Sequence, residues 1–348
     1  MANTKIEIRN LFKVFGDDPD QAMTHVKKGF SKQDLLDQHG HVLGLRDINI
    51  KVPAKQIQVI MGLSGSGKST LIRHINRLIE PTTGEVIVDG ENVLAMTPMD
   101  LREFRRHKAS MVFQRFGLLP HRNVAQNVAY GLTVQGIAGG EANERAQRWI
   151  DRVGLAGFEG HFPAQLSGGM QQRVGLARAL ATDAEILLMD EAFSALDPLI
   201  RTDMQNILLD LQEELHKTIV FITHDLDEAL RIGDEIAILR DGEVIQQGDP
   251  QSIIMRPADD YIADFIKDIN RGRVVEVRSV MTKASRTSGP KMHHRMPIED
   301  AIQELSHAGK DTGAVVDRNG KTIGKITMKA AIAAMARPDR MAETVRYK

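Results

Sequence analysis

The chain has 348 residues and a formal net charge of −1, with 42% hydrophobic and 26% charged residues, a composition typical of a soluble protein of two domains. It contains no cysteine, which excludes disulfides and cysteine-ligated metal sites. No apolar run reaches the roughly 18 residues that span a bilayer, and residues 1–7 lack the apolar core of a signal peptide, so the sequence predicts a cytosolic chain.

Charge is distributed unevenly along the chain. Residues 271–348 carry 16 Lys and Arg against 8 Asp and Glu, a net charge of +8. This contrast marks a change of domain, and a basic surface attracts polyanions such as acidic lipid, nucleotide or the other domain. A solvated basic surface explains the same charge.

Short apolar segments alternate with helical stretches from about residue 46 to 246, which predicts a mostly parallel sheet covered by helices. The clearest strands are apolar at consecutive positions, as in strands buried on both faces: Ile57–Met61, Ile186–Asp190, Ile219–Thr223 and Glu235–Arg240. Asp241-Gly242 then predicts a hairpin turn before a strand at Glu243–Gln247. Residues 120–180 are more helical.

Residues 17–43 interrupt this alternation and predict a helical insertion between two strands. Asp17–Asp20 is a turn sequence, and Ser31 with Asp34 resembles a capping box. The insertion is either a peripheral addition or a contact site.

The first domain is expected at residues 1–270, ending after a helix around Tyr261–Asp268. The remaining residues, 271–348, predict a small α+β module: a helix opened by Pro297, two strands at 314–316 and 322–327 around an Asn319-Gly320 turn, and a helix over 328–336. The first helix has apolar residues at helical spacing, namely Ile298, Ala301, Ile302, Leu305 and Ala308. The module resembles one CBS repeat, with Val274–Met281 as a candidate leading strand.

A phosphate-binding loop lies between the first clear strand and a predicted helix. The segment from Gly62 to Ser69 matches G-x-x-x-x-G-K-[ST] in the strand–loop–helix context that the motif requires. Lys68 supplies a charge for the outer phosphates, and the Ser69 hydroxyl is placed to ligate Mg²⁺. The predicted ATP-binding residues of this loop are Gly62, Ser64, Gly65, Ser66, Gly67, Lys68, Ser69 and Thr70.

Two acids follow the second clear strand. The buried run over 186–190 delivers Asp190 beside the Mg²⁺, in the manner of a Walker B strand, and Glu191 follows where a base polarises the attacking water. Adjacent acids also occur at solvated strand ends, an alternative that the phosphate loop upstream makes minor.

A second glycine-rich turn, Leu166–Arg173, opens a helix far from the phosphate loop. Backbone N–H groups at a helix N-terminus attract phosphate oxygens, and Gly168-Gly169 let the backbone approach closely. The segment resembles the signature motif of ABC ATPases, in which each of two copies completes the other's ATP site. Gln114, Ser194–Asp197 and His224 match the Q-loop, D-loop and switch histidine of that family, in that order.

The resemblance implies roles for these residues. Gln114 contacts the Mg²⁺ and links it to the membrane partner, Asp197 reaches across the dimer, and His224 contacts the γ-phosphate. Ser167 and Gly169 bind the γ-phosphate that the opposite chain's Lys68 holds.

Two further assignments also follow from the family. Phe15 takes the place of the aromatic residue that stacks on adenine, with a core Phe as the alternative. The groove around Gln114–Pro120 contacts a permease, with Phe116, Leu118 and Leu119 as candidate apolar contacts that otherwise pack inside the helical subdomain.

A narrower resemblance covers nearly the whole chain. The insertion after Phe15, the stretch Asn76–Pro81, Met170 within the signature and the CBS-like end are similar to the ATPase subunits of importers for glycine betaine, choline, carnitine and related quaternary amines. It implies an α/β P-loop ABC ATPase, with a RecA-like core, a helical subdomain and a small CBS-like module. Its expected cofactors are ATP and Mg²⁺.

The same resemblance implies a head-to-tail homodimer at the cytoplasmic face of the inner membrane, bound to a separate permease and served indirectly by an extracytoplasmic substrate-binding protein, with no nucleic acid. A trimethylamine oxide or histidine importer is the first alternative. A non-transport ABC ATPase acting on nucleic acid or the ribosome is another, although the chain has one cassette and no long heptad run. A small-molecule kinase or GTPase explains only the phosphate loop.

Overall fold

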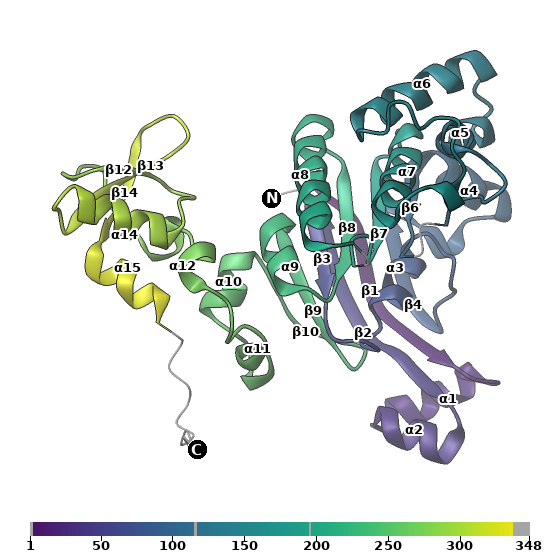
Figure 1. Cartoon of the computed structure of the whole chain (residues 1–348). Coiled ribbons are helices and arrows are strands. Elements are labelled where there is room, and N and C mark those ends of the chain that lie inside the picture. The colour runs from purple at the N-terminus through teal and green to yellow at the C-terminus, as the bar shows by residue number, and fades with distance from the viewer. Residues whose placement is uncertain (1–2, 115–116, 195, 337–348) are drawn as a thin grey trace. The chain divides into compact units, whose positions relative to one another are not determined.

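The computed structural model describes residues 3–114, 117–194 and 196–336. The chain divides into two compact units, Met1–Gln247 and Gly248–Lys348, drawn in Figure 1. The second unit begins before the expected domain boundary at residue 270, because it includes the helices α10 (Pro250–Met255) and α11 (Asp260–Phe265). Among the described residues, no helix is long and apolar enough to cross a bilayer.

The first unit contains two sheets. A four-stranded antiparallel sheet has the order β2-β1-β4-β5, and a six-stranded sheet has the order β10-β9-β3-β8-β7-β6. The strands of the first sheet are β1 (Thr4–Phe15), β2 (Val42–Pro53), β4 (Thr83–Val88) and β5 (Glu91–Asn92). The strands of the second are β3 (Ile57–Met61), β6 (Ala109–Val112), β7 (Ile186–Asp190), β8 (Thr218–Thr223), β9 (Glu235–Arg240) and β10 (Glu243–Gly248).

The six-stranded sheet confirms the predicted parallel core. Strands β9, β3, β8, β7 and β6 run parallel to their neighbours, and all residues of β3, β7 and β8 are buried. Parallel neighbours place their carboxyl ends at one edge of the sheet, where ligands of α/β proteins bind. The predicted turn between β9 and β10 has positive φ at Asp241 (52°) and Gly242 (87°), as a type I′ hairpin requires.

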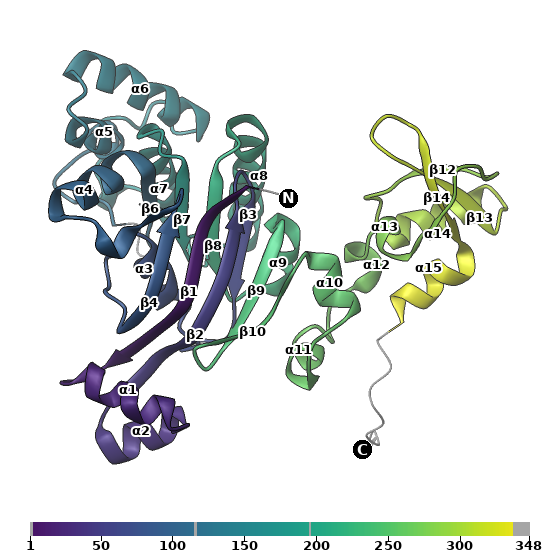
Figure 2. The same ribbon diagram turned by 180° about the vertical axis from the view of Figure 1, so that it is seen from behind.

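The main core lies between the two sheets, which Figure 2 shows from behind. Buried aliphatic side chains of β1, β2 and β4 pack with those of the parallel strands and of α3 (Lys68–Ile75). The connection from β5 to β6 runs through η1 (Val93–Ala95), α4 (Pro98–Glu103) and a π-helical turn, η2 (Phe104–Lys108). Phe104 buries its ring in the same core. This core fixes α3 behind the phosphate loop.

A helical subdomain interrupts the sheet, as expected for residues 120–180. It consists of α5 (Val124–Val134), α6 (Gly139–Arg152), the short η3 (Pro163–Gln165) and α7 (Gly168–Ala181). Helix α6 buries Ala142, Ala146 and Ile150, which share one face because they are four residues apart. These side chains join a separate core with α5 and α7.

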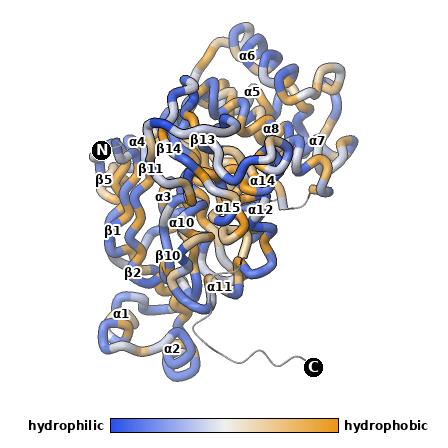
Figure 3. Tube along the Cα trace, turned by 90° about the vertical axis from the view of Figure 1, so that its left-hand side faces the viewer, coloured by the Kyte–Doolittle hydropathy of each residue, from blue (hydrophilic) through white to orange (hydrophobic). Residues whose placement is uncertain are grey.

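The predicted insertion is confirmed as two helices, α1 (Pro19–Lys27) and α2 (Lys32–His39), between β1 and β2. The Ser31–Asp34 capping box is present. Both helices are largely hydrophilic (Figure 3), and their few buried side chains, Met23, Val26 and Leu35 among them, pack against the ends of β1 and β2. Lys32 Nζ donates to the Gly65 carbonyl at 3.4 Å, so α2 adjoins the phosphate loop.

His74 in α3 makes the stability of this unit depend on pH. Its side chain is fully buried, its Nδ1 lies 2.6 Å from the Thr70 carbonyl oxygen, and burial lowers its pKa to about 4. The unfolded chain therefore takes up a proton near pH 6.5 that the folded chain does not, so the contribution of His74 is present above that pH and lost as pH falls towards 4. The loss amounts to about 3 kcal/mol.

We expect urea unfolding to show this difference. Wild type should lose stability relative to His74→Gln between pH 6.5 and 4, whereas the control His121→Gln, at an exposed position, should follow wild type. If the free energy of unfolding changed with pH equally in wild type and His74→Gln, His74 would not be the source of the pH dependence.

The second unit holds a four-stranded sheet of order β11-β14-β13-β12. Its strands are β11 (Thr282–Lys283), β12 (Lys291–His293), β13 (Thr312–Val316) and β14 (Thr322–Thr327), and its helices besides α10 and α11 are α12 (Arg271–Val274), α13 (Val277–Val280), α14 (Ile298–His307) and α15 (Met328–Met335). The predicted order helix–strand–turn–strand–helix is confirmed for α14 to α15. Ile298, Ala301 and Leu305 are buried as expected, whereas Ala308 is exposed because α14 ends there.

The predicted leading strand at Val274–Met281 is wrong. This segment forms the short helices α12 and α13, and the strands β11 and β12 begin after it. Val275 and Val277 are buried, and short helices can bury such residues as well as a strand can.

Candidate active site

The phosphate loop connects β3 to α3 at the carboxyl edge of the parallel sheet. Gly62 has φ +151°, and a Cβ there would lie 2.2 Å from the Leu239 carbonyl oxygen. Gly67 has φ +99°, and its Cβ would lie 2.7 Å from the Gly44 carbonyl oxygen. Both positions therefore require glycine, which keeps the loop backbone close against β2 and β9.

Lys68 folds back onto this loop. Its side chain is only 4% exposed, and its Nζ donates to the carbonyl oxygens of Gly62 at 2.9 Å and Leu63 at 3.0 Å. Burial lowers the pKa of Lys68, and the charges of Glu191 and Asp190 oppose that shift. A phosphate in the loop would add a closer negative charge to this buried ammonium group, whose nearest carboxylate oxygen, Glu191 Oε1, is 3.8 Å away.

Asp190 ends β7 with a fully buried side chain. Its Oδ1 accepts a hydrogen bond from Ser69 Oγ at 2.7 Å, and its Oδ2 lies 3.1 Å from an Arg73 guanidinium nitrogen. The sequence interpretation missed Arg73, although its place one turn after Ser69 on α3 was a signal, because residues four apart share a helix face.

The side chain of Glu191 lies close to three other residues that the sequence analysis predicted to belong to the site. Gln114 Nε2 donates to Glu191 Oε2 at 2.8 Å, His224 Nδ1 lies 3.7 Å from the same oxygen, and Lys68 Nζ lies 3.8 Å from Oε1. These residues follow β6, β7, β8 and β3, so the shared carboxyl edge of the parallel strands brings them together. The side chain of Glu191 is 16% exposed, so solvent can reach it.

The backbone around Glu191 is held in an uncommon conformation. Its φ is +47°, a region that non-glycine residues seldom adopt. The Ile222 carbonyl accepts from its N–H at 3.2 Å, and Ser194 Oγ donates to its carbonyl at 2.9 Å. The strain is retained at a predicted functional position, as is common for active sites.

Phe15 lies near the phosphate loop and is 39% exposed. A Cβ on Gly44 would lie 2.7 Å from its ring, and the Gly44 carbonyl in turn adjoins Gly67. Lys13 Nζ lies 4.9 Å from the ring centroid. The exposed ring is therefore available for stacking and does not belong to the core.

The signature segment and the D-loop pack together. Ser167 caps α7 by accepting from the Met170 N–H at 3.3 Å, and Asp197 caps α8 (Pro198–Leu215) by accepting from the Ile200 N–H at 3.1 Å. A Cβ on Gly169 would lie 2.9 Å from Ile200 Cγ2. Ser167, Gly168 and Asp197 are exposed, so a second molecule can reach them. Ala195 lies outside the described residues.

The predicted permease groove is partly described. Phe116 lies outside the described residues, Leu118 packs against the core of the helical subdomain, and Leu119 binds Asn127 Oδ1 through its N–H at 2.8 Å. The internal packing that the sequence left as an alternative is therefore present for Leu118, and contact with a permease stays a prediction.

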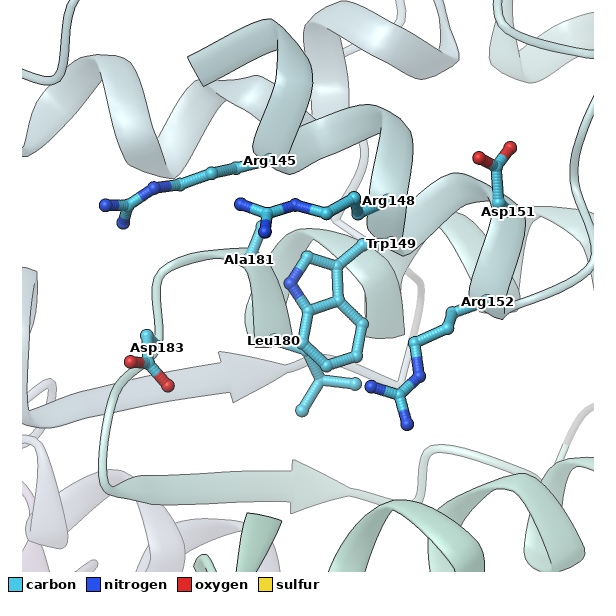
Figure 4. Close-up of a pocket in the computed structure, with 8 residues that line it drawn as sticks. All are labelled: Arg145, Arg148, Trp149, Asp151, Arg152, Leu180, Ala181 and Asp183. Atoms are coloured by element: carbon cyan, nitrogen blue, oxygen red, sulfur yellow. The ribbon is translucent and has the colours of Figure 1, made fainter. Parts of the chain in front are cut away.

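A cavity of about 550 Å³ lies elsewhere, on the helical subdomain. Figure 4 shows its lining from α6 and from the end of α7, including Arg145, Arg148, Trp149 and Arg152. None of the predicted site residues lines it.

Comparison with known proteins identifies the family. The model of the ABC transporter family matches residues 45–194. The glycine betaine/proline betaine transport system ATP-binding protein ProV of Salmonella typhimurium is 45% identical over 95% of this chain and 83% of ProV. The chain belongs to the ABC transporter family.

Other relatives refine this placement. The glycine betaine/carnitine transport ATP-binding protein GbuA of Listeria monocytogenes is 49% identical over 92% of this chain and 80% of GbuA. The trimethylamine N-oxide transport system ATP-binding protein TmoW of Ruegeria pomeroyi is 44% identical over 95% of this chain and 97% of TmoW. A solved dimeric ATP-binding cassette in a post-hydrolysis state, bound to ADP and Pi, superposes with a TM-score of 0.61 at 32% identity, covering 70% of this chain and 98% of that structure.

These findings confirm the predicted family, the P-loop ABC ATPase fold and an ATPase that serves transport. The chain binds ATP as a member of this family. The predicted similarity to ATPase subunits of quaternary-amine importers is also confirmed.

Proposed function

We propose that the chain is the ATP-hydrolysing subunit of an importer for glycine betaine or a related quaternary amine such as choline, carnitine or proline betaine. The observation that carries this proposal is the 45–49% identity to ATP-binding subunits of glycine betaine transport systems over more than nine-tenths of the chain. Trimethylamine N-oxide is the second candidate cargo, because this chain spans 97% of a TmoW subunit but 83% of ProV.

The proposed catalytic arrangement uses two copies of the chain. Residues 62–70 of one copy hold the ATP phosphates, Phe15 stacks on adenine, and Ser167, Gly168, Gly169 and Asp197 of the other copy complete the site. Exposure of the signature and D-loop caps supports this arrangement, as does the dimeric form of the solved cassette. Glu191 then takes a proton from the attacking water, with Gln114 and His224 holding its carboxylate.

The oxygen donors at Ser69, Gln114 and Asp190 suit Mg²⁺, which is held in nucleotide sites by one or two carboxylates together with substrate phosphates. Among the described residues there is no cluster of three or more acidic, His or Cys side chains able to bind a metal alone, which agrees with a metal that enters with ATP. When bound, Mg²⁺ would neutralise charge that develops on the phosphates.

We further propose that the chain is peripheral, at the cytoplasmic face of the membrane beside a multi-span permease, with an extracytoplasmic binding protein choosing the cargo. Residues 1–270 form the proposed ATPase domain, and residues 271–348 a CBS-like module that dimerises, binds a nucleotide or senses ionic strength. The helix–strand–strand–helix order of α14, β13, β14 and α15 supports the proposed CBS-like module.

Transport by the complex reconstituted in vesicles tests the function. ATP-driven uptake of radiolabelled glycine betaine should exceed uptake of trimethylamine N-oxide, choline, carnitine and histidine, each measured alone. Preference for trimethylamine N-oxide would select the second candidate, and purification with nucleic acid in place of a permease would reject both. A truncation that removes residues 272–348 should alter dimerisation, ATPase rate or salt response if the module is regulatory.

A further inference from the structure

Helices α8 and α9 (Leu226–Ile232) are joined by three polar contacts. Arg201 bonds Asp225 Oδ2 at 3.0 Å, Gln205 Nε2 donates to Glu228 Oε1 at 3.0 Å, and an Arg231 guanidinium nitrogen donates to Asn206 Oδ1 at 2.7 Å. Helix α8 follows the D-loop and α9 follows His224. Of the three contacts, the bond from Arg201 to Asp225 lies where both helices begin, next to these two loops, whereas Arg231 is in the last turn of α9.

Arg201 reaches the D-loop itself. A second nitrogen of its guanidinium group donates to the carbonyl oxygens of Leu196 at 3.2 Å and Ser194 at 3.5 Å. One side chain thus bonds both the backbone of the D-loop and the carboxylate of Asp225. Ser194 also binds the carbonyl of Glu191 through its hydroxyl.

Asp225 is fixed from its other side. Its N–H donates to Thr223 Oγ1 at 2.9 Å, and its Oδ1 accepts from the Glu228 N–H at 3.1 Å, which caps α9. His224 precedes Asp225 directly and lies 3.7 Å from Glu191. A displacement of Asp225 therefore moves His224 relative to the Glu191 carboxylate.

Stability does not explain this polar interface. Gln205 and Glu228 are each only 5% exposed, and burial raises the pKa of Glu228, so its charged form is disfavoured. Arg201 Nε is buried without a hydrogen-bond partner among the described residues. The side chains of Arg201 and Asp225 are 27% and 33% exposed, and ion pairs that solvent reaches add little stability.

We propose that Arg201 is a positioning residue that ties the D-loop to His224, so that contact of Asp197 with a second chain places His224 for hydrolysis. This inference rests on the proposed two-chain site. It predicts that Arg201 acts on turnover through His224 and not on ATP binding.

Steady-state ATPase measurements on the full complex test the coupling. Arg201→Ala should lower kcat about tenfold or more, because small misplacements of catalytic groups are costly, while KM for ATP stays within about twofold. In a His224→Ala background, Arg201→Ala should cause almost no further loss, since both changes remove one coupled action. Arg231→Ala, which breaks the outermost contact on the same helices, is the matched control and should keep the wild-type kcat.

Several outcomes would overturn the proposal: unchanged kcat in Arg201→Ala, a loss that multiplies with that of His224→Ala, or an equal loss in Arg231→Ala. If Arg201→Ala does not fold, Arg201→Lys and Asp225→Asn replace it, and failure of both to fold would make the pair structural and reject the proposal. Glu191→Gln distinguishes failure of the proposed function from failure of this inference. If Glu191→Gln abolishes turnover while Arg201→Ala keeps the wild-type kcat, the proposed ATPase site stands and only the role of Arg201 is wrong.

Discussion

Glu191→Gln should lower the ATPase rate about 10²- to 10⁴-fold, the usual contribution of a positioned general base. The amide keeps the size of the side chain and one oxygen for Gln114, which now donates to Glu191 Oε2 at 2.8 Å, but it cannot take a proton from water. ATP binding should persist, because the variant also removes a negative charge that lies 3.8 Å from Lys68 Nζ.

Single-turnover hydrolysis and size-exclusion chromatography with ATP measure this prediction. The variant should form a dimer that retains ATP and releases phosphate about 10²- to 10⁴-fold more slowly than wild type. Glu213→Gln, at an exposed position on α8, is the matched control and should behave as wild type. Turnover at the wild-type rate in Glu191→Gln would show that Glu191 is not the general base.

Lys68→Ala should weaken ATP binding by about 100-fold, equivalent to about 2.7 kcal/mol. The ammonium group supplies charge-assisted hydrogen bonds to phosphate oxygens, and no other Lys or Arg lies in residues 62–70. The protein without ATP should still fold, because a buried ammonium whose pKa is lowered by burial contributes little net stability.

Thermal unfolding with and without ATP is the measurement. ATP should raise the unfolding temperature of wild type, since ligands that bind only the folded state stabilise it. At an ATP concentration near the wild-type Kd, this rise should be almost absent in Lys68→Ala. Lys51→Ala changes an exposed lysine of β2 and should keep the full rise. An undiminished rise in Lys68→Ala would show that the phosphates bind elsewhere.

The fold of the first unit was largely predictable because its strands are apolar without interruption. Strand β3 begins and ends where the sequence predicted, as does β7, and the hairpin turn after β9 was predicted from Asp241-Gly242 alone. The segment over 274–281 was predicted wrongly, because a short apolar segment carries too little periodicity to separate strand from helix.

The predicted site residues of the phosphate loop and around Glu191 share one edge of the sheet, but the sequence did not reveal their contacts. The bond from Ser69 to Asp190 spans 121 positions, and that from Gln114 to Glu191 spans 77. Arg73 and Arg201 escaped notice because an arginine on a helix is usually a solvated surface residue. The role of each arginine depends on which loops the fold places within hydrogen-bonding distance of its side chain.

The most direct test of the two-chain site is complementation between two defective chains, both in the Glu191→Gln background. One chain carries Lys68→Ala and the other Ser167→Arg, so neither forms a complete site with its own copy. In the mixed dimer, Lys68 of the second chain meets Ser167 of the first. We therefore expect ATP to produce a heterodimer that retains about one ATP per pair, whereas ATP should not dimerise either chain alone. A mixture that stays monomeric and retains no ATP would contradict a site shared between two chains.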